Sequence, residues 1–355
     1  MISYVTGNIL HDHADAIINT VNTVGVMGKG LALQFKKAFP DNYKSYKAAC
    51  DNNELLVGTL LITPTQSMSP PHYIINFPTK AHWKGNSKIE YIQSGLEALK
   101  KEVQRLELSS VAIPALGSGL GGLPWELVEQ EIKSSLSDMP QVEWRVYPPQ
   151  SAPAAKQMVN RTSKPRMTIG RAAVLGLIHE YLTSGLHYSL SLLEVQKLVY
   201  FLTVSGEKLK NQVHFQKHHY GPYADVLRHV LEKMEGHFID GYGDGANKPD
   251  ISIELRKNAA EHAKTFLEAH PETKQRFDEV TKLVDGFESP YGMELLSTVH
   301  WVVTQELNSE APELHEVINK VHSWNERKAE MKATHIQAAF ERLKNQNWLS
   351  RLAPV

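Results

Sequence analysis

Residues 16–38 read AIINTVNTVGVMGKGLALQFKKA, and this stretch decides the fold class. It begins with an apolar run at Ala16–Asn19, which is typical of a buried strand, and ends with a helical pattern at Ala32–Ala38. Between them, Gly28 and Gly30 lead directly into the helix. Backbone N–H groups ahead of a helix form an anion site. The loop therefore predicts phosphate binding, although an ordinary turn is the plainer alternative for one glycine loop.

Two more glycine-bearing segments follow predicted strands: residues 6–9 read TGNI, and residues 114–125 read PALGSGLGGLPW. In an open α/β sheet, ligands bind beyond the carboxyl ends of the strands, where glycine lets the backbone approach them closely. We therefore expect the Gly28–Gly30 and Gly117–Gly122 loops to hold a diphosphate from two sides. Neither loop ends in the Gly-Lys-Ser/Thr of Walker A, and the acidic ribose anchor of a dinucleotide-binding fold is missing.

Short apolar runs alternate with helical patterns through the first 149 residues. Strands are predicted at residues 16–19, 58–63, 73–77, 110–114 and 143–147. Helices are predicted at residues 32–38, 89–106 and 127–136. This alternation is typical of a layered α/β domain with a mostly parallel sheet.

The sequence pattern changes after a proline-, serine- and alanine-rich stretch, which is typical of a linker. We place a first domain at residues 1–149, a linker at 150–166 and a second domain at 167–355. The second domain is predicted to be mostly α-helical, with helices at residues 171–184, 192–204, 224–234, 259–269, 273–286, 291–306, 312–327 and 334–346. A strand pair at residues 213–218 and 250–253 interrupts them.

Composition excludes several classes of protein. Among 355 residues, 38 are basic and 39 acidic, so capture of nucleic acid by bulk charge is disfavoured. The single cysteine, Cys50, excludes intramolecular disulfides and cysteine-based zinc sites. The first four residues, MISY, lack the pattern of a signal peptide, and no apolar run approaches the roughly 20 residues that span a membrane. We therefore expect a cytoplasmic protein without membrane contact.

Together, the glycine loops of residues 1–149 resemble those of the macrodomain family, a three-layer α/β/α fold that binds ADP-ribose. The match is strongest to the branch that removes terminal ADP-ribose, through Met27-Gly28-Lys29-Gly30 and through Asn76-Phe77-Pro78-Thr79-Lys80. The resemblance implies no cofactor and an ADP-ribose site whose residues lie in the three glycine segments and at two strand ends. These residues are Asn8, Ile9, Thr20, Asn22, Gly28, Gly30, Leu31, Thr79, Gly117, Ser118, Gly119, Leu120 and Gly121.

In this context Lys80 is the predicted catalytic residue. It follows a strand and a Pro-Thr turn, which should direct its amine toward the ligand. A neutral lysine amine can attack C1″ of ribose, form a Schiff base and release the linked group. The pocket must then lower a pKa that starts near ~10.4. The alternatives are a solvated surface lysine at Lys80 and, for the predicted ribose contact Asn22, a turn-capping asparagine.

The sequence departs from this branch of the family at two positions. The branch has an aspartate in the second glycine loop, where this chain has Gly121, so the carboxylate that helps in catalysis is missing. His82 is a candidate substitute, with a surface histidine as the alternative. Asn8 stands where many macrodomains have an aspartate against the adenine, and its amide can still bind the adenine edge.

Two segments of the second domain resemble the Panacea/SocA-type antitoxin family: residues 192–201 (LLEVQKLVYF) and 219–223 (HYGPY). A helical core with a Gly-Pro turn is the plainer interpretation. His214, His218 and His219 suggest a metal site at first, but neighbours in a strand face opposite ways, which disfavours one.

The combination of the two domains is similar to the DarG-type antitoxin family. That resemblance implies removal of ADP-ribose from thymidine bases of single-stranded DNA, and a DarT-like ADP-ribosyltransferase toxin as partner of the second domain. Acidic and aromatic residues that could imitate DNA toward the toxin are Tyr220, Tyr223, Asp225, Asp240, Tyr242 and Asp244. The alternatives are a non-catalytic ADP-ribose-binding module, and a hydrolase of ADP-ribosylated protein or of O-acetyl-ADP-ribose.

Overall fold

The computed structural model describes residues 1–184, 190–209, 213–245, 251–307 and 312–352. The chain divides into two compact units. Residues 1–163, together with Asp244 and Gly245, form the first, and the other described residues from Lys164 onward form the second. Part of the predicted linker belongs to the first unit. The short helix η2 (Ala155–Gln157) lies within it, Val159 packs against the core, and the N–H of Arg161 donates to the Lys37 carbonyl at 2.9 Å.

The first unit is built around a six-stranded sheet with the order β1-β6-β5-β2-β4-β3. All neighbouring strands are parallel except β3, which runs antiparallel to β4. The strands are β1 (Ile2–Tyr4), β2 (Ala16–Asn22), β3 (Leu61–Pro64), β4 (Tyr73–Lys80), β5 (Ser110–Ile113) and β6 (Glu143–Val146). The predicted α/β layered class is confirmed.

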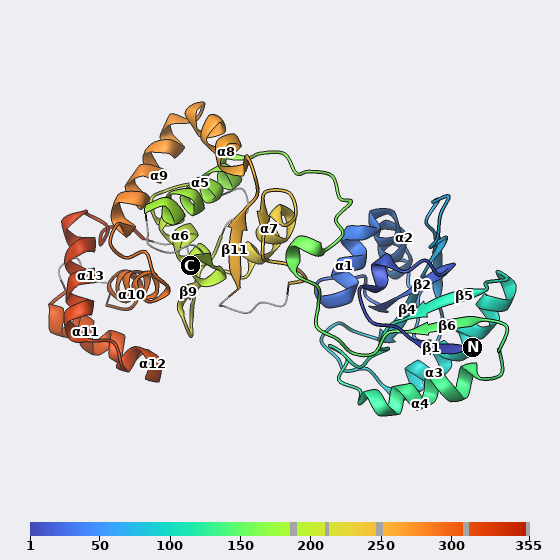
Figure 1. Ribbon diagram of the computed structural model, residues 1–355. Coiled ribbons are helices and arrows are strands. Elements are labelled where there is room, and N and C mark those ends of the chain that lie inside the picture. The colour runs from blue at the N-terminus through green and yellow to red at the C-terminus, as the bar shows by residue number, and fades with distance from the viewer. Residues whose placement is uncertain (185–189, 210–212, 246–250, 308–311, 353–355) are drawn as a thin grey trace. The chain divides into compact units, whose positions relative to one another are not determined.

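Helices cover both faces of this sheet, because successive residues of a buried strand point to opposite sides. Ile18 of β2 packs in one core with α3 (Ile89–Arg105) and α4 (Trp125–Leu136). Ile17, the residue before it, packs in another core with α1 (Gly30–Ala38). A further helix, α2 (Pro40–Asp51), packs near the end of β2 and was not predicted. The result is three layers (Figure 1).

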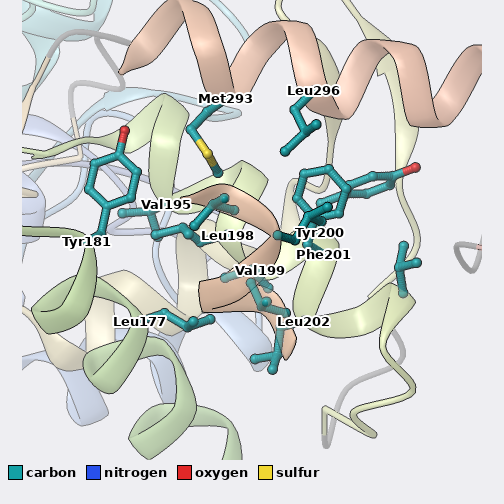
Figure 2. Close-up of a cluster of buried hydrophobic side chains, with 14 of the residues drawn as sticks. Leu177, Tyr181, Val195, Leu198, Val199, Tyr200, Phe201, Leu202, Met293 and Leu296 are labelled. Atoms are coloured by element: carbon teal, nitrogen blue, oxygen red, sulfur yellow. The ribbon is translucent and has the colours of Figure 1, made fainter. Parts of the chain in front are cut away.

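The second unit is mostly helical and has its own hydrophobic core. Its helices are α5 (Ile169–Ser184), α6 (Leu192–Val204), α7 (Val226–Met234), α8 (Ala259–Glu268), α9 (Pro271–Val284), α10 (Pro290–Trp301), the π-helix η3 (Val302–Leu307), α11 (Leu314–His322), α12 (Glu326–Ala329) and α13 (Ala333–Asn345). Helix α6 lies in the middle of the core, where Leu198 and Phe201 pack against residues of other helices such as Leu177 and Met293 (Figure 2).

Two expectations for the second unit were wrong. The predicted helix at residues 312–327 breaks into α11 and α12, because the chain turns at Trp324 and Asn325 caps a new helix. The two predicted strands also do not pair with each other. Strand β8 (Gln216–His218) pairs with β9 (Gly221–Tyr223), whereas β11 (Ser252–Leu255) lies between β7 (Leu190–Ser191) and β10 (Ile239–Asp240). Asp250, where the second strand was predicted to begin, is outside the described residues.

Candidate active site

Three loops meet where β2, β4 and β5 end. Asn22, the last residue of β2, pairs in register with Lys80, the last residue of β4. The loop after β2 carries Gly28 and leads to Gly30, and the loop after β5 carries Gly117–Gly122. The carboxyl edge of the sheet therefore brings together the segments that the sequence predicted for the site.

Lys80 is positioned by the strand itself. The expected turn at Pro78 and Thr79 is absent, because both residues continue β4. The half-buried ammonium of Lys80 donates a hydrogen bond to the carbonyl of Leu120, in the second glycine loop. Burial lowers the pKa of Lys80 below its usual value. A lowered pKa enlarges the neutral, nucleophilic fraction of the amine near neutral pH.

The two glycine loops approach each other. Gly30 begins α1 with a φ of +59°, in the left-handed region that favours glycine. A Cβ at this position would lie 3.2 Å from Cδ1 of Leu120, whose side chain is 69% exposed. Next to Gly30, Leu31 is partly buried against the core under α1. Leu120 of the second loop thus lies next to both Lys80 and Gly30 of the first loop.

Asn22 organises the first glycine loop. Its Nδ2 donates to the carbonyl of Val26 at 2.6 Å. Its Oδ1 accepts from the N–H of Val24 at 3.0 Å and from the hydroxyl of Tyr46 at 3.2 Å. These contacts agree with the turn-capping alternative, and contact between Asn22 and ribose hydroxyls stays a prediction.

The second glycine loop leaves no room for a side chain at Gly121. A Cβ there would lie 2.2 Å from the Gly117 carbonyl oxygen and 2.3 Å from Oγ of Ser87. The N–H of Ser87 also donates to the Gly121 carbonyl at 2.9 Å. This backbone therefore cannot carry a carboxylate at that position. A Cβ at Gly119, by contrast, would meet nothing within 4 Å.

Several buried polar atoms around these loops have no hydrogen-bond partner: Nδ2 of Asn8, Oγ of Ser87 and Oγ of Ser118. The Oδ1 of Asn8 is engaged, since it accepts from the N–H of Leu10 at 3.0 Å and caps η1 (Ile9–His11). Buried polar atoms are nearly always hydrogen-bonded. The three unpaired atoms therefore retain hydrogen-bonding capacity beside the glycine segments.

The remaining predicted residues differ in how far they are buried. Ile9 is buried in the core, Thr79 is buried in β4, and Thr20 is partly buried in β2. His82 is exposed in the loop after β4, and its Nδ1 accepts from the N–H of Lys84 at 3.2 Å. The described contacts of His82 do not include Lys80, so its catalytic role stays a prediction.

Comparison with known proteins identifies the family. The Macro domain family matches residues 18–132. A Thermus aquaticus protein named DNA ADP-ribosyl glycohydrolase is 43% identical over 344 residues, which cover 97% of this chain and 93% of that protein. The chain belongs to the DNA ADP-ribosyl glycohydrolase family.

Two further relatives each match part of this glycohydrolase family member. The macrodomain of Mycobacterium tuberculosis DarG is 45% identical and aligns with a TM-score of 0.42, over 42% of this chain and 99% of that one. A Thermosipho africanus protein, named a DNA ADP-ribosyl transferase-DNA ADP-ribosyl glycohydrolase fusion protein, is 37% identical over 142 residues, which cover 36% of this chain and 37% of that protein.

Sequence reasoning missed two residues that shape the glycohydrolase site. Ser87 supports the second glycine loop, and Tyr46 holds Asn22 through a hydrogen bond to its backbone carbonyl at 2.8 Å. Tyr46 lies on α2, which the sequence did not predict, so nothing pointed to it. A lone serine after an exposed segment carries no recognisable signal either.

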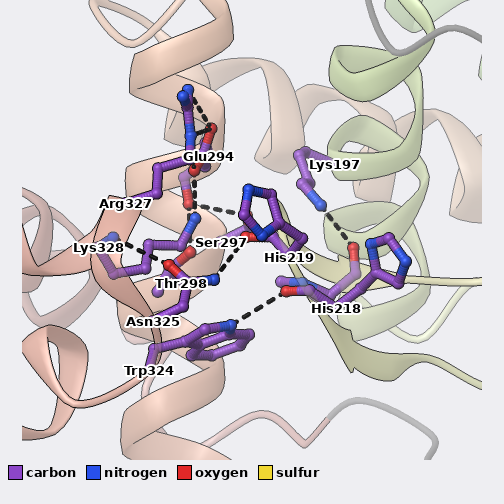
Figure 3. A network of polar contacts seen from close by, with 11 residues as sticks. Lys197, His218, His219, Glu294, Ser297, Thr298, Trp324, Asn325, Arg327 and Lys328 are labelled. Atoms are coloured by element: carbon purple, nitrogen blue, oxygen red, sulfur yellow. Dashed lines mark hydrogen bonds and ion pairs between the residues drawn. The ribbon is translucent and has the colours of Figure 1, made fainter.

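In the second unit, residues 192–201 and residues 219–223 contact each other (Figure 3). Lys197 of α6 donates to the carbonyl of Pro222 in β9 at 2.6 Å. Its neighbour Gln196 exchanges two hydrogen bonds with the backbone of Ala224, at 3.1 and 3.2 Å. Burial is the main cause that lowers the pKa of Lys197 to about 7. Lys197 and Gln196 of α6 therefore anchor the β8–β9 hairpin to the core.

A buried ion cluster supports the same hairpin from the other side (Figure 3). Glu294 of α10 is fully buried and is bonded by Lys328, which is also fully buried, and by Arg327 at 3.0 Å. The preceding residues, Trp324 and Asn325, donate to the carbonyls of His218 and His219, each at 3.0 Å. Within the described residues, no three His, Cys, Asp or Glu side chains gather as metal ligands.

The six residues predicted to imitate DNA differ in their exposure to solvent. Asp225 is exposed, and Tyr220 and Tyr223 are partly exposed beside the hairpin. Asp240 and Tyr242 are buried, so the expectation that they form a surface was wrong. The cause is Glu235, whose carboxylate accepts from the N–H groups of Gly241 and Tyr242 and draws this segment inward. Asp244 lies in the turn that follows. None of the described helices has the length and apolar character that crossing a membrane requires.

Proposed function

We propose that the first unit removes ADP-ribose from thymidine bases of single-stranded DNA, with Lys80 as the nucleophile. One observation carries the proposal: a partly buried lysine with a lowered pKa stands at the end of β4 and bonds Leu120, the residue of the second glycine loop that Gly30 of the first approaches. The name of the Thermus aquaticus relative, with which the chain shares nearly its whole length, supports DNA as the substrate.

The reaction follows from the chemistry of a neutral amine. Nζ of Lys80 attacks C1″ of the distal ribose, the bond from C1″ to the base nitrogen breaks, and the ribose ring opens to a Schiff base. The two amine protons end on the ring oxygen and on the released base. Water then hydrolyses the Schiff base, which frees ADP-ribose and restores the lysine.

The remaining residues of the site hold the substrate. The N–H groups of the loops at Gly28–Leu31 and Gly117–Gly121 bind the diphosphate, helped by the unpaired hydroxyl of Ser118. Nδ2 of Asn8 is free to donate to the adenine edge. The backbone of the second loop excludes a carboxylate at Gly121. Proton transfer to the base must therefore come from another group, for which His82 is the candidate.

A direct assay separates this function from its alternatives. The chain is incubated with an ADP-ribosylated thymidine oligonucleotide, with a protein ADP-ribosylated on carboxylates, and with O-acetyl-ADP-ribose. We expect release of ADP-ribose from the oligonucleotide only. Binding of ADP-ribose without release from any substrate would instead identify a binding module.

We also propose that the second unit binds and neutralises a DarT-like toxin, within the cytoplasm. The Thermosipho africanus fusion protein supports this partner, because its name joins a DNA ADP-ribosyl transferase and a glycohydrolase in one chain. The blocking surface is the face around the β8–β9 hairpin, where Tyr220, Tyr223 and Asp225 are accessible. A cleft that holds single-stranded DNA is basic, so acidic and aromatic groups can occupy it.

Residues 164–355 suffice to test this second proposal. Lys164 is the right starting point because its ammonium lies 4.9 Å from the ring centre of Phe238, inside the second unit. We expect this fragment to bind the toxin at micromolar concentration and single-stranded DNA to compete with it. Binding without competition would place the contact on another toxin surface, and no binding would leave only the enzymatic proposal.

A further inference from the structure

The loop that follows Lys80 is exposed and basic. Residues 80–89 read KAHWKGNSKI, with three lysines and no acidic residue. Every residue from Ala81 to Asn86 is exposed. Neither Lys84 nor Lys88 has an ion-pair partner in the described part of the chain. The positive charge beside the candidate nucleophile is therefore available to a ligand.

This loop is also held in a fixed shape. At its start, the hydroxyl of Thr23 donates to the carbonyl of Ala81 at 2.8 Å, which ties it to the first glycine loop. At its end, Ser87 is tied to the second glycine loop through Gly121. Between them, the N–H of Gly85 donates to the carbonyl of His82 at 3.0 Å. The loop therefore presents its side chains from a rigid base beside the site.

The side chain it presents most prominently is Trp83, which is 50% exposed. Its ring stacks on that of His82, with centroids 5.6 Å apart and an interplanar angle of 28°. The ammonium of Lys84 lies 5.0 Å from the ring centre. An indole that is supported by a second ring and left half in water has no packing role that explains its exposure.

We propose that Trp83 stacks on a base that flanks the modified thymidine in single-stranded DNA, while Lys84 and Lys88 contact the neighbouring phosphates. The proposal rests on the proposed removal of ADP-ribose from DNA and extends it to the strand around the modified base. An exposed aromatic ring with lysines beside it is the arrangement that binds single strands without reading sequence.

The position of Trp83 suits this role. Trp83 is three positions after Lys80, so the two Cα atoms lie within about 11 Å of each other. A base joined to C1″ at Lys80 therefore has its neighbours within reach of the Trp83 ring. An ADP-ribosylated carboxylate of a protein offers neither a base to stack nor a series of phosphates, so this loop favours a nucleic acid.

The test compares two substrates that differ only in the flanking strand: an ADP-ribosylated thymidine oligonucleotide and ADP-ribosylated thymidine alone. For Trp83→Ala we expect KM for the oligonucleotide to rise about tenfold, because a base–aromatic stack contributes at this scale. The kcat and the turnover of the mononucleoside should not change. Trp83→Phe should restore most of the loss. Lys84→Gln should weaken the salt dependence of oligonucleotide binding by ~0.7 in the log–log slope.

Tyr4→Ala is the matched control, since Tyr4 is 47% exposed and lies on β1, at the other end of the strand order from β4. An equal loss on both substrates would show that Trp83 only supports the fold, and an unchanged oligonucleotide KM would also overturn the proposal. If the parent chain releases nothing from DNA, the proposed function fails by itself. Anisotropy of an unmodified labelled oligonucleotide, with parent and Trp83→Ala, then decides the stacking proposal separately.

Discussion

The buried polar groups at the glycine loops of the first unit contrast with the buried charges that support the hairpin of the second. In the first unit, Asn8, Ser87 and Ser118 each leave a buried polar atom unpaired around the glycine loops. In the second unit, the buried charges of Glu294 and Lys328 bond each other, and that of Lys197 bonds a backbone carbonyl. The unpaired atoms of the first unit can still bond a ligand. The buried charges of the second unit spend their hydrogen bonds on supporting the hairpin.

This difference separates a binding site from a scaffold. A buried polar group without a partner costs roughly 1–3 kcal/mol, so unpaired atoms that gather in one place need a compensating role. Four other buried atoms are also unpaired but lie within strands or helices, away from the loops: Asn19 Oδ1 in β2, Trp144 Nε1 in β6, Arg171 Nε in α5 and Arg228 Nε in α7. Unpaired polar atoms indicate the candidate site only where they lie in segments that follow the strands of the sheet.

The largest effect expected in the first unit comes from Lys80→Ala. This variant should abolish release of ADP-ribose from DNA, because the proposed Schiff base forms on this amine. Binding of ADP-ribose should stay within about tenfold of the parent, or ~1.4 kcal/mol, since the side chain donates only to the Leu120 carbonyl. Calorimetry and a release assay measure the two quantities.

Lys80→Arg is the matched control, because it keeps the positive charge but cannot form a Schiff base. It should be as inactive as Lys80→Ala, and borohydride should trap an adduct in the parent only. Because burial lowers the pKa of Lys80, kcat/KM of the parent should rise with pH as the amine loses its proton and then level off. Full activity of either variant would exclude the Schiff-base step.

The next effect distinguishes Gly119 from Gly121 in the same loop. Gly119→Glu should lower ADP-ribose affinity by orders of magnitude while leaving the melting temperature unchanged, because its Cβ has open space in the protein and its charge repels the diphosphate. Gly121→Ala should lower both affinity and melting temperature, because its Cβ would overlap the Gly117 carbonyl. Unchanged affinity in Gly119→Glu would place the ligand elsewhere.

Much of the first unit could be predicted from sequence because its signals are local. Apolar runs, helical periods and glycines at strand ends indicated the sheet edge at which Lys80 lies, although the turn expected at Pro78 and Thr79 is part of β4. Helix α2 was not predicted because its sequence, PDNYKSYKAACD, has a weak apolar stripe. The hydrogen bonds that Asn22 makes with Val26 and Tyr46 depend on how the loop closes, which no local pattern reports.

The second unit was harder to predict because its important contacts join distant segments. Lys197 and Pro222 meet across 25 positions, and Glu294 and Lys328 across 34. The segment around Tyr242 has the composition of a loop, yet Glu235 draws it into the core. Such burial follows from tertiary partners, so the surface role assigned to Asp240 and Tyr242 could not be judged from sequence.

A third prediction tests the buried ion cluster of Glu294, Arg327 and Lys328 in the second unit. Glu294→Gln removes the carboxylate that Lys328 and Arg327 share and leaves a fully buried ammonium without its counter-charge. Breaking such a buried pair costs about 3–5 kcal/mol, so the unfolding midpoint of the second unit should fall markedly in urea. Turnover of ADP-ribosylated thymidine by the first unit should not change. Retained stability would mean that the cluster does not hold the hairpin.

The smallest effect we predict is a pH dependence that belongs to the second unit, through His300. This ring is fully buried, accepts from the Tyr200 hydroxyl at 2.7 Å and donates to the Trp348 carbonyl at 3.1 Å. Burial lowers its pKa to about 4, whereas an unfolded chain binds the proton near the ordinary value of about 6.5. The stability that the neutral ring provides is thus fully present above about pH 6.5 and is lost as the pH falls toward 4.

Urea unfolding of residues 164–355 between pH 6.5 and 5 should show this loss as a slope of the unfolding free energy against pH, at most ~1.4 kcal/mol per pH unit for one proton. His300→Gln cannot titrate, so the slope should flatten whatever the substitution does to stability at pH 7. An equal slope in the variant would assign the proton uptake to another group.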